Sequence, residues 1–347
     1  MLKKHKKIIT LVLVAALCMA AMFTMGACGK EEAPPEPVTY TNALTGEITE
    51  QPVAAARPLV VSIDNVGDAV PQANLSKADL VYEFPVEGKQ TRLQAIYYTE
   101  FPEEFGPIRS TRPYFVDLTR EYKGIFLAHG WSPQAKSYLM EGHVPYINAM
   151  NSECDFYRVS DKSAPHNSYI TWEEVKAKID KEGWWSETQK IKAFKFLKDG
   201  AESKGDLVDF VEFSWSSSDC EFTYDAETGK YTRTIDEGRE YIDHETGEVI
   251  KVDNILVQKV TSSVLDSKGR LKIDMCAGGD ALLFTDGHVV KGTWSREGLD
   301  SRTVLVDAEG KQFKLSPGHT WVMVADQNCD IDYDATPAPT EEASEEE

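Results

Sequence analysis

The hydrophobic pattern divides the chain into a first half in which predicted strands alternate with helices and a second half of strands and turns. In the first half, apolar runs typical of buried strands occupy residues 58–63, 79–84, 92–99 and 124–130. Strands that alternate with helices imply a sheet covered by helices. Residues 58–200 are therefore predicted to form an α/β (α+β) domain.

Three helices are predicted from their start signals, which are a proline in the first turn or a side chain that can cap the first backbone N–H groups. These signals are Pro113 before an apolar stripe over 113–122, the Ser132-Pro133 pair, and the capping box formed by Thr171 and Glu174. The third helix is expected to end at Gly183, because glycine commonly follows the last helical residue.

The pattern changes at about Asp206, where helical periodicity nearly disappears. Strand-like runs follow, from VDFVEFSW at 208–215 to TWVMV at 320–324, and Gly-containing turn sequences separate them. Short strands joined by tight turns are typical of small barrels and sandwiches. Residues 206–333 are therefore predicted to form a β-rich domain, a small barrel or sandwich.

The first residues have the pattern of an export signal. MLKKHKK supplies four lysines, an apolar run follows from Ile8 to Phe23, and small residues lead to Cys28. A cysteine at the cleavage point resembles the lipobox of bacterial lipoproteins, so residues 1–27 are predicted to be a signal peptide and Cys28 to carry the lipid (palmitate). The alternatives are an ordinary cleaved signal and an uncleaved anchor helix, but the apolar run is shorter than the roughly 20 residues that span a bilayer.

Polar segments flank the predicted domains. Residues 28–57 are rich in Pro, Glu and Ala without a hydrophobic period, so they are predicted to be a tether between lipid and domains. Residues 334–347 are predicted to be an acidic disordered tail. The protein is therefore expected at the cell membrane, anchored by lipid and facing outside the cytoplasm.

Charge limits the class of partner. The chain has 37 Lys and Arg against 57 Asp and Glu, a formal net charge of −20. This balance argues against nucleic acid as a partner. The cysteines show no spacing typical of a zinc site, and no metal or cofactor is predicted. Because the chain as a whole is acidic, a local group of arginines is unusual in it.

Such a group occurs in FGPIRSTRP at 105–113, where Arg109, Ser110, Thr111 and Arg112 come directly before the predicted start of a helix. The first backbone N–H groups of a helix have no partner within it and favour anions. Guanidinium groups and hydroxyls at this place predict a site for phosphate or carboxylate. The alternative is that both arginines pair with internal acids.

Other polar residues are predicted to join this site because they lie at strand ends or in the loops that follow, where sites in α/β sheets form. The further ligand-binding candidates are Arg92, His129, His166 and Asn167, and the supporting candidates are Asp64, Asn65, Glu83 and Glu87. In the second half, Trp294 and Trp321 could form a binding platform, but large aromatic residues in a small β-domain more often fill the core.

Catalytic combinations are ranked below binding. Ser110 or Thr111 could act with His129 or His166, and Glu83 and Glu87 could act as paired carboxylates. Cys154 could act with a histidine and Asn167, but no local signature of a thiol hydrolase is present. Whether the protein is an enzyme stays open.

Several sequence blocks, taken in order, resemble the YerB family of bacterial lipoproteins, which carries a two-part domain of unknown function (DUF3048). The blocks are SIDN (62–65), ADLVYEFPVEGKQTR (78–92), GPIRSTRP (106–113), LAHG (127–130), YRVSDKSAPHN (157–167), YTR (231–233), DNILVQ (253–258), GTW (292–294) and PGHTW (317–321). The resemblance implies an exported lipoprotein with N- and C-terminal domains of this kind. It brings no established activity.

The sequence thus predicts a cell-envelope lipoprotein that binds an anionic envelope component, through a phosphate or carboxylate group, or a membrane-protein partner. Two alternatives remain open. One is a phosphate-handling transferase or hydrolase of the cell wall. The other is a structural adaptor of a membrane enzyme complex that uses the surface of the β-rich domain.

Overall fold

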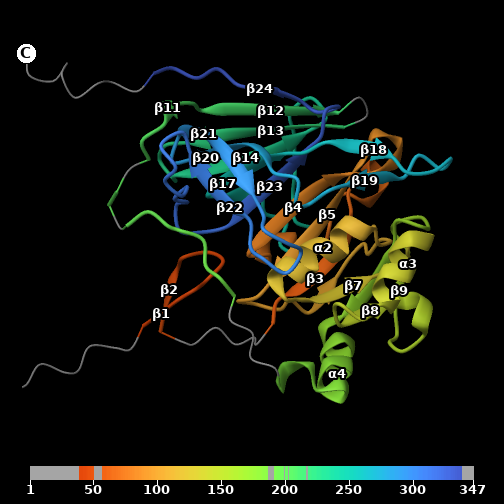
Figure 1. Ribbon diagram of the computed structural model, residues 1–347. Helices are drawn as coiled ribbons and strands as arrows, with labels where there is room; N and C mark the ends of the chain where they lie inside the picture. The colour runs from red at the N-terminus through yellow and green to blue at the C-terminus, as the bar shows by residue number, and fades with distance from the viewer. Residues whose placement is uncertain are drawn as a thin grey trace, which may run out of the picture. The chain divides into compact units, whose positions relative to one another are not determined.

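The computed structural model describes residues 39–50, 57–186, 191–198, 200–201, 203–215 and 218–337 (Figure 1). The predicted signal peptide, Cys28 and the last ten residues of the predicted tail lie outside these ranges. Residues from Thr39 onward belong to one compact unit. No helix in the described ranges is long and apolar enough to cross a membrane.

An 11-stranded sheet, counted over the described residues, contains strands from both halves of the sequence, in the order β11-β21-β20-β17-β23-β4-β5-β3-β7-β8 with β22 beside β21. The first half supplies β3 (Leu59–Asp64), β4 (Leu80–Pro85), β5 (Thr91–Tyr97), β7 (Ile125–Ala128) and β8 (Tyr146–Asn148). The second half supplies β11 (Asp206–Leu207), β17 (Asn254–Lys259), β20 (Gly279–Thr285), β21 (His288–Ser295), β22 (Val304–Asp307) and β23 (Thr320–Ala325).

The two halves join at β23, which pairs in parallel with β17 on one side and with β4 on the other. Every residue of β23 is buried, as expected for a strand covered on both faces. The strands of the second half therefore do not close into a small barrel, which was one of the two forms predicted from the sequence. They continue the sheet begun by the first half.

A six-stranded sheet lies over one face of the central sheet, in the order β15-β14-β13-β12-β24 with β16 beside β14. Its strands are β12 (Phe210–Trp215), β13 (Ser218–Asp225), β14 (Lys230–Ile235), β15 (Arg239–Glu240), β16 (Lys251–Val252) and β24 (Asp330–Asp332). Alternate residues of β12 and β14 are buried, because only one face of this sheet meets the core. These buried residues pack with one face of β3, β5 and β23.

The helices α2 (Pro113–Tyr122), α3 (Pro133–Met140) and α4 (Trp172–Glu182) begin as the sequence predicted. Ser132 and Thr171 accept hydrogen bonds from backbone N–H groups of α3 and α4, and Gly183 ends α4 in the left-handed conformation. Residues of α2 and α3 pack on the face of the central sheet opposite the six-stranded sheet. Residues of α4 pack with the other core.

Short elements complete the described structure. They are β1 (Tyr40–Thr41), β2 (Ile48–Thr49), β6 (Glu104–Phe105), β9 (Tyr157–Arg158), β10 (Ser168–Thr171), β18 (Ser262–Val264), β19 (Leu271–Ile273) and the 3-10 helices η1 (Gly67–Ala69), η2 (Leu75–Lys77), η3 (Glu87–Lys89), η4 (Ala149–Asn151) and η5 (Trp184–Ser186).

Part of the predicted tether is folded. β1 and β2 pair, Leu44 between them is fully buried, and Asn42 Nδ2 donates a hydrogen bond to Asp79 (3.1 Å). The first residues of the predicted tail are also ordered against the body, because Thr336 and Leu207 exchange backbone hydrogen bonds. A short hydrophobic anchor within a polar segment gives too little periodicity to be recognised in the sequence.

Candidate functional site

Two groups of polar residues begin at the end of β3, where Asp64 and Asn65 follow each other. Successive side chains of a strand point to opposite faces of a sheet. Asp64 shares the face of Val60, which packs with α2, and forms an ion pair with Arg109. Asn65 donates a hydrogen bond to Glu83, on the face toward the six-stranded sheet.

On the α2 face, three guanidinium groups meet around Ser110. We refer to Arg92, Arg109 and Arg112 as the arginine cluster. Arg92 Nη1 donates a hydrogen bond to the Ser110 carbonyl oxygen (2.8 Å), and Arg112 Nη1 donates to the Ser110 hydroxyl (3.3 Å). The backbone N–H of Arg109 donates to the Ser62 carbonyl on β3 (2.9 Å). The segment FGPIRSTRP is thereby fixed beside the arginine that β5 supplies.

Two carboxylates contact the arginine cluster. Asp64 is 1% exposed, and its Oδ2 lies 3.0 Å from Arg109 Nε and 2.8 Å from His166 Nδ1. Glu87 binds Arg112 with both oxygens, because Arg112 Nε donates to Oε2 (3.0 Å) and Nη2 donates to Oε1. Burial acts to raise the pKa of Glu87, but the hydrogen bond and charge of Arg112 lower it overall.

The positive charge of Arg92 is left without a carboxylate partner. Within the described ranges Arg92 forms no ion pair, and its buried Nε has no hydrogen-bond partner. Burial and the charges of Arg112 and Arg109 lower the pKa of Arg92 to about 10. The cluster therefore has three guanidinium groups for two carboxylates.

The arginine cluster also lies at the start of α2. Arg112 is the residue before the first helical turn, its side chain makes no capping hydrogen bond, and Pro113 follows it. The first turn of α2 contains no acidic side chain. Its N-terminal N–H groups add to the positive potential of the cluster. The predicted position of Ser110, Thr111 and Arg112 at the mouth of this helix is confirmed.

The side chains of the remaining predicted ligand-binding residues form hydrogen bonds within the protein. The Thr111 hydroxyl donates to the Gly130 carbonyl oxygen (3.2 Å), and Asn167 Nδ2 donates to two backbone carbonyls, so both side chains fix loops. His129 Nδ1 lies 2.5 Å from Ser168 Oγ. Burial, Arg158 and Arg109 lower the pKa of His129, which places this ring within the field of the arginine cluster.

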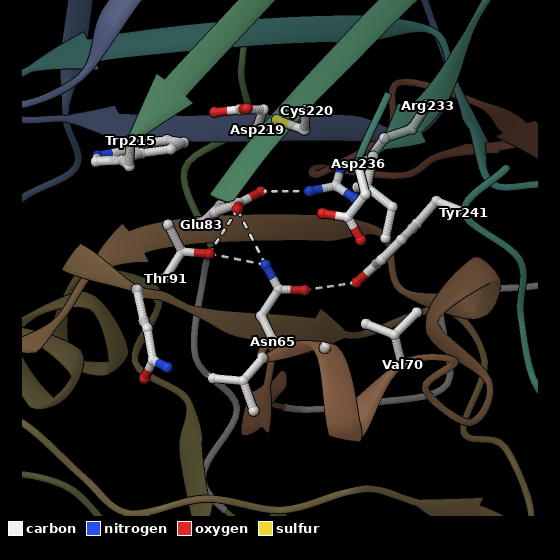
Figure 2. Close-up of a pocket in the computed structure, with 14 residues that line it drawn as sticks. Asn65, Val70, Glu83, Thr91, Trp215, Asp219, Cys220, Arg233, Asp236 and Tyr241 are labelled. Carbon is white, nitrogen blue, oxygen red and sulfur yellow. Dashed lines mark hydrogen bonds and ion pairs between the residues drawn. The ribbon is translucent and has the colours of Figure 1, made fainter. Parts of the chain in front are cut away.

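Asn65 and Glu83 do not support the arginine cluster as the sequence analysis expected. They lie on the opposite face of the sheet, in the pocket of Figure 2. Glu83 Oε1 accepts hydrogen bonds from Asn65 Nδ2 (3.0 Å) and Thr91 Oγ1 (2.7 Å). Glu83 Oε2 accepts from Arg233 Nη2 (3.1 Å) and Trp321 Nε1 (3.0 Å). The reason is the pleat of β4 and β5, which directs Glu83 and Thr91 away from Arg92.

Arg233 lines this pocket and belongs to the sequence block YTR, but it was not among the predicted site residues. It is 1% exposed, and its guanidinium carbon lies 4.0 Å from the ring centre of Tyr241 and 4.6 Å from that of Trp321. The sequence contained a signal: the alternation of KYTRTI places Arg233 on the same buried face as Tyr231 and Ile235. A charged residue in a buried register needs a partner of opposite charge. Trp294 and Trp321 lie in the core, as favoured from the sequence.

The catalytic combinations considered from the sequence are not brought together. The Ser110 hydroxyl accepts from Arg112 and the Thr111 hydroxyl donates to the Gly130 carbonyl, and neither forms a hydrogen bond with a histidine ring in the described residues. Glu83 and Glu87 belong to different faces of the sheet. Burial and the charge of Glu174 raise the pKa of Cys154, so its thiol is not activated.

Comparison with known proteins gives consistent matches over most of the chain. Residues 44–185 match the family described as "Protein of unknown function (DUF3048) N-terminal domain", and residues 210–322 match the corresponding C-terminal domain. YerB of Bacillus subtilis (strain 168), which is named as a lipoprotein, is 35% identical over 317 residues, 90% of this chain and 94% of YerB. The crystal structure of YerB from Bacillus subtilis has a TM-score of 0.75 at 34% identity and covers 84% of this chain and 99% of that one.

Proposed function

We infer the function from one premise: the chain belongs to the protein family defined by the N-terminal and C-terminal DUF3048 domains. We propose that it is a lipid-anchored protein of the cell envelope, outside the cytoplasm, whose arginine cluster binds an anionic group of an envelope component or partner. The name of its Bacillus relative as a lipoprotein supports the anchoring.

The charge of the arginine cluster is the observation that carries the binding proposal. Arg92 is 5% exposed and has neither a carboxylate nor a partner for Nε within the described structure, while burial and, after it, the charges of Arg112 and Arg109 lower its pKa. A bound anion would offset this repulsion and accept the free hydrogen bond. In a chain of net charge −20, one guanidinium in excess of the two carboxylates favours a specific anion over general attraction.

Phosphate is the ligand chemistry that fits best. Guanidinium groups bind phosphate and carboxylate oxygens through paired hydrogen bonds, and the dipole at the start of α2 favours a negative charge there. Arg109 is the accessible member of the cluster, because its side chain is 23% exposed whereas that of Arg112 is 5% exposed. Arg109 is therefore assigned to the ligand, and Arg112 to fixing the segment.

Thermal unfolding with and without inorganic pyrophosphate tests this proposal. Pyrophosphate should raise the melting temperature of the wild type, because a ligand that binds the folded state stabilises it. Arg109→Ala should weaken binding by about 1.5–3 kcal/mol, the typical value of hydrogen bonds to charged groups. Arg239→Ala is the matched control, since Arg239 forms an exposed pair with Asp236 (2.5 Å) outside the cluster. An equal response of both variants, or none in the wild type, would contradict the proposal.

The anchoring is tested separately at Cys28. Cys28→Ala should release the protein from the membrane fraction, because the lipid would be its attachment. Retention of this variant with an uncleaved N-terminus, detected by mass spectrometry, would instead assign the anchor to the apolar run at 8–23.

A phosphate-handling enzyme is the second candidate, and the contact between Asp64 and His166 favours it. A buried carboxylate at 2.8 Å from Nδ1 fixes the ring and leaves Nε2 for proton transfer. Release of phosphate from pyrophosphate, measured for the wild type and His166→Gln at equal pyrophosphate occupancy, decides the question. Loss of turnover with retained binding would support an enzyme, and absence of turnover in the wild type would oppose one for this substrate.

A further inference from the structure

Arg158 is an exposed arginine on β9, outside the arginine cluster, and it was not among the predicted site residues. Its Nη1 donates a hydrogen bond to Asn167 Oδ1 (2.7 Å). Its side chain forms no other hydrogen bond and no ion pair with the residues that the structure describes. Nε and Nη2 lie on one edge of a guanidinium group, so this edge of Arg158 stays free. Such an edge binds two oxygens of a phosphate or carboxylate group.

The pairing of β9 with β10 places Arg158 near His129. Arg158 is directly opposite Ser168 on β10, and opposed residues of paired strands share a face of the sheet. Ser168 Oγ lies 2.5 Å from His129 Nδ1. The backbone N–H of His129 donates to the carbonyl oxygen of Arg109 (3.0 Å). His129 therefore links the strand of Arg158 with the segment that carries the accessible member of the arginine cluster.

A second series of contacts connects Arg158 with the same site through Asp64. Asn167, which binds Arg158, also donates to two backbone carbonyl oxygens of the loop between β9 and β10. His166 precedes Asn167 and binds Asp64 (2.8 Å), the carboxylate that pairs with Arg109 (3.0 Å). The loop is therefore fixed both to the arginine cluster and to Arg158. This arrangement holds Arg158 in place before any ligand binds.

Positive charge exceeds negative charge around His129. Burial lowers the pKa of His129 most, and the charges of Arg158 and then Arg109 lower it further. No carboxylate in the described part of the chain is among the causes of this shift. Asp64 is compensated by its contacts with Arg109 and His166. A ligand with two negative groups would offset the charges of both arginines.

We propose that Arg158 is a further ligand-binding residue of this site, which makes it selective for a ligand with two adjacent anionic groups, such as a diphosphate, over a ligand with one. This inference rests on the proposed binding of an anion by Arg109. One anionic group binds Arg109, and the second binds the free Nε–Nη2 edge of Arg158. The ring of His129 lies beside the bound ligand.

Three variants distinguish a contact with the ligand from a general effect of charge. Arg158→Gln removes the charge and keeps an amide that can donate to Asn167. Arg158→Lys keeps the charge without the paired donors, and it tests the same contact if the Gln variant does not fold. Lys162→Gln is the matched control, because it removes one charge from the same loop and Lys162 is not among the causes of the pKa shift of His129.

Isothermal titration of the full chain with inorganic phosphate and with pyrophosphate, at one pH and ionic strength, tests the proposal. The wild type and Lys162→Gln should bind pyrophosphate about tenfold or more tightly than phosphate, as expected for one further charge-assisted contact. Arg158→Gln should lose most of this preference with little change in phosphate affinity, and Arg158→Lys should lose a smaller part. Arg109→Ala should weaken the binding of both anions.

The outcomes separate this inference from the proposed function. If Arg158→Gln binds both anions and keeps the preference of the wild type, the inference is overturned and the proposed function stands. Equal affinity of the wild type for phosphate and pyrophosphate would have the same consequence. Absence of binding of either anion to the wild type would overturn both.

Discussion

The arginine cluster and the pocket around Arg233 occupy opposite faces of the same strands, and they handle positive charge differently. In the pocket, Arg233 and Glu83 form a buried pair, and Glu83 accepts four hydrogen bonds from residues of both sequence halves. In the cluster, Arg109 is partly exposed and Arg92 lacks a carboxylate within the described structure. The pair in the pocket joins the two halves, whereas the cluster leaves charge for a ligand.

This difference shows that an arginine beside an acid is not by itself evidence of a site. Burial makes the loss of a partner expensive, so a buried pair resists change. An arginine is a better candidate for ligand binding when it is partly exposed and when arginines outnumber the carboxylates around it. Three measurements would break or sharpen the comparison.

The largest expected effect is that of Arg233→Met. Glu83 would remain buried without its cation, and such losses typically cost about 3–5 kcal/mol of the free energy of unfolding. Denaturant unfolding measures this change. Arg239→Met, at an exposed pair, should change stability by no more than about 0.5 kcal/mol. A similar small effect for both arginines would show that the buried pair does not join the halves.

Arg112→Ala should have an intermediate effect. Arg112 donates to Glu87 and to the Thr111 carbonyl oxygen, and it is almost fully buried. Leaving such partners unsatisfied costs about 1–3 kcal/mol, and the lower part of this range is expected because Glu87 is 29% exposed. Arg109→Ala leaves the fully buried Asp64 with His166 as its remaining charged partner in the described structure, so it should lose at least as much stability in the same denaturation experiment. A clearly smaller loss for Arg109→Ala would show that Asp64 does not depend on Arg109.

The smallest expected effect is the pH dependence that His129 adds. Its pKa is lowered from 6.5 in the folded state, so folding favours the neutral ring. The resulting stability is present above the unfolded pKa and is lost as the pH falls through the folded pKa. His129→Gln should flatten this part of the stability profile. In a proton NMR titration, pyrophosphate should raise the pKa of His129, because it compensates the charge of Arg109; an unchanged titration would argue that the anion binds elsewhere.

Local signals in the sequence predicted the helices and many strands well. Pro113 marks the first turn of α2, and Thr171 and Gly183 bound α4, because the chemistry that starts and ends a helix lies within a few residues. The order of strands could not be predicted in the same way. The parallel pairing of β4 with β23 joins residues far apart in the chain, and no single-sequence pattern specifies it.

Local sequence signals also predicted only part of the candidate site. The position of Arg109 and Arg112 near the start of α2 followed from their place before a predicted helix. Their pairing with the internal acids Asp64 and Glu87 corresponds to the alternative considered in the sequence analysis. Glu83 was misassigned because its partner Arg233 is 150 residues away in the sequence. The alternation of β14 showed that Arg233 is buried, but it could not show which acid would meet it.

The position of β23 also has a consequence for biosynthesis. Glu83 and Trp321 are 238 residues apart, yet they meet on adjacent strands near the middle of the sheet. A chain that emerges from its N-terminus exposes the edge of β4 until its last long strand arrives, and an open edge is a template for aggregation. Contacts of such separation also slow folding. A nonsense mutation before residue 320 would therefore remove a central strand rather than an end, and the truncated product is expected to be prone to aggregation and proteolysis.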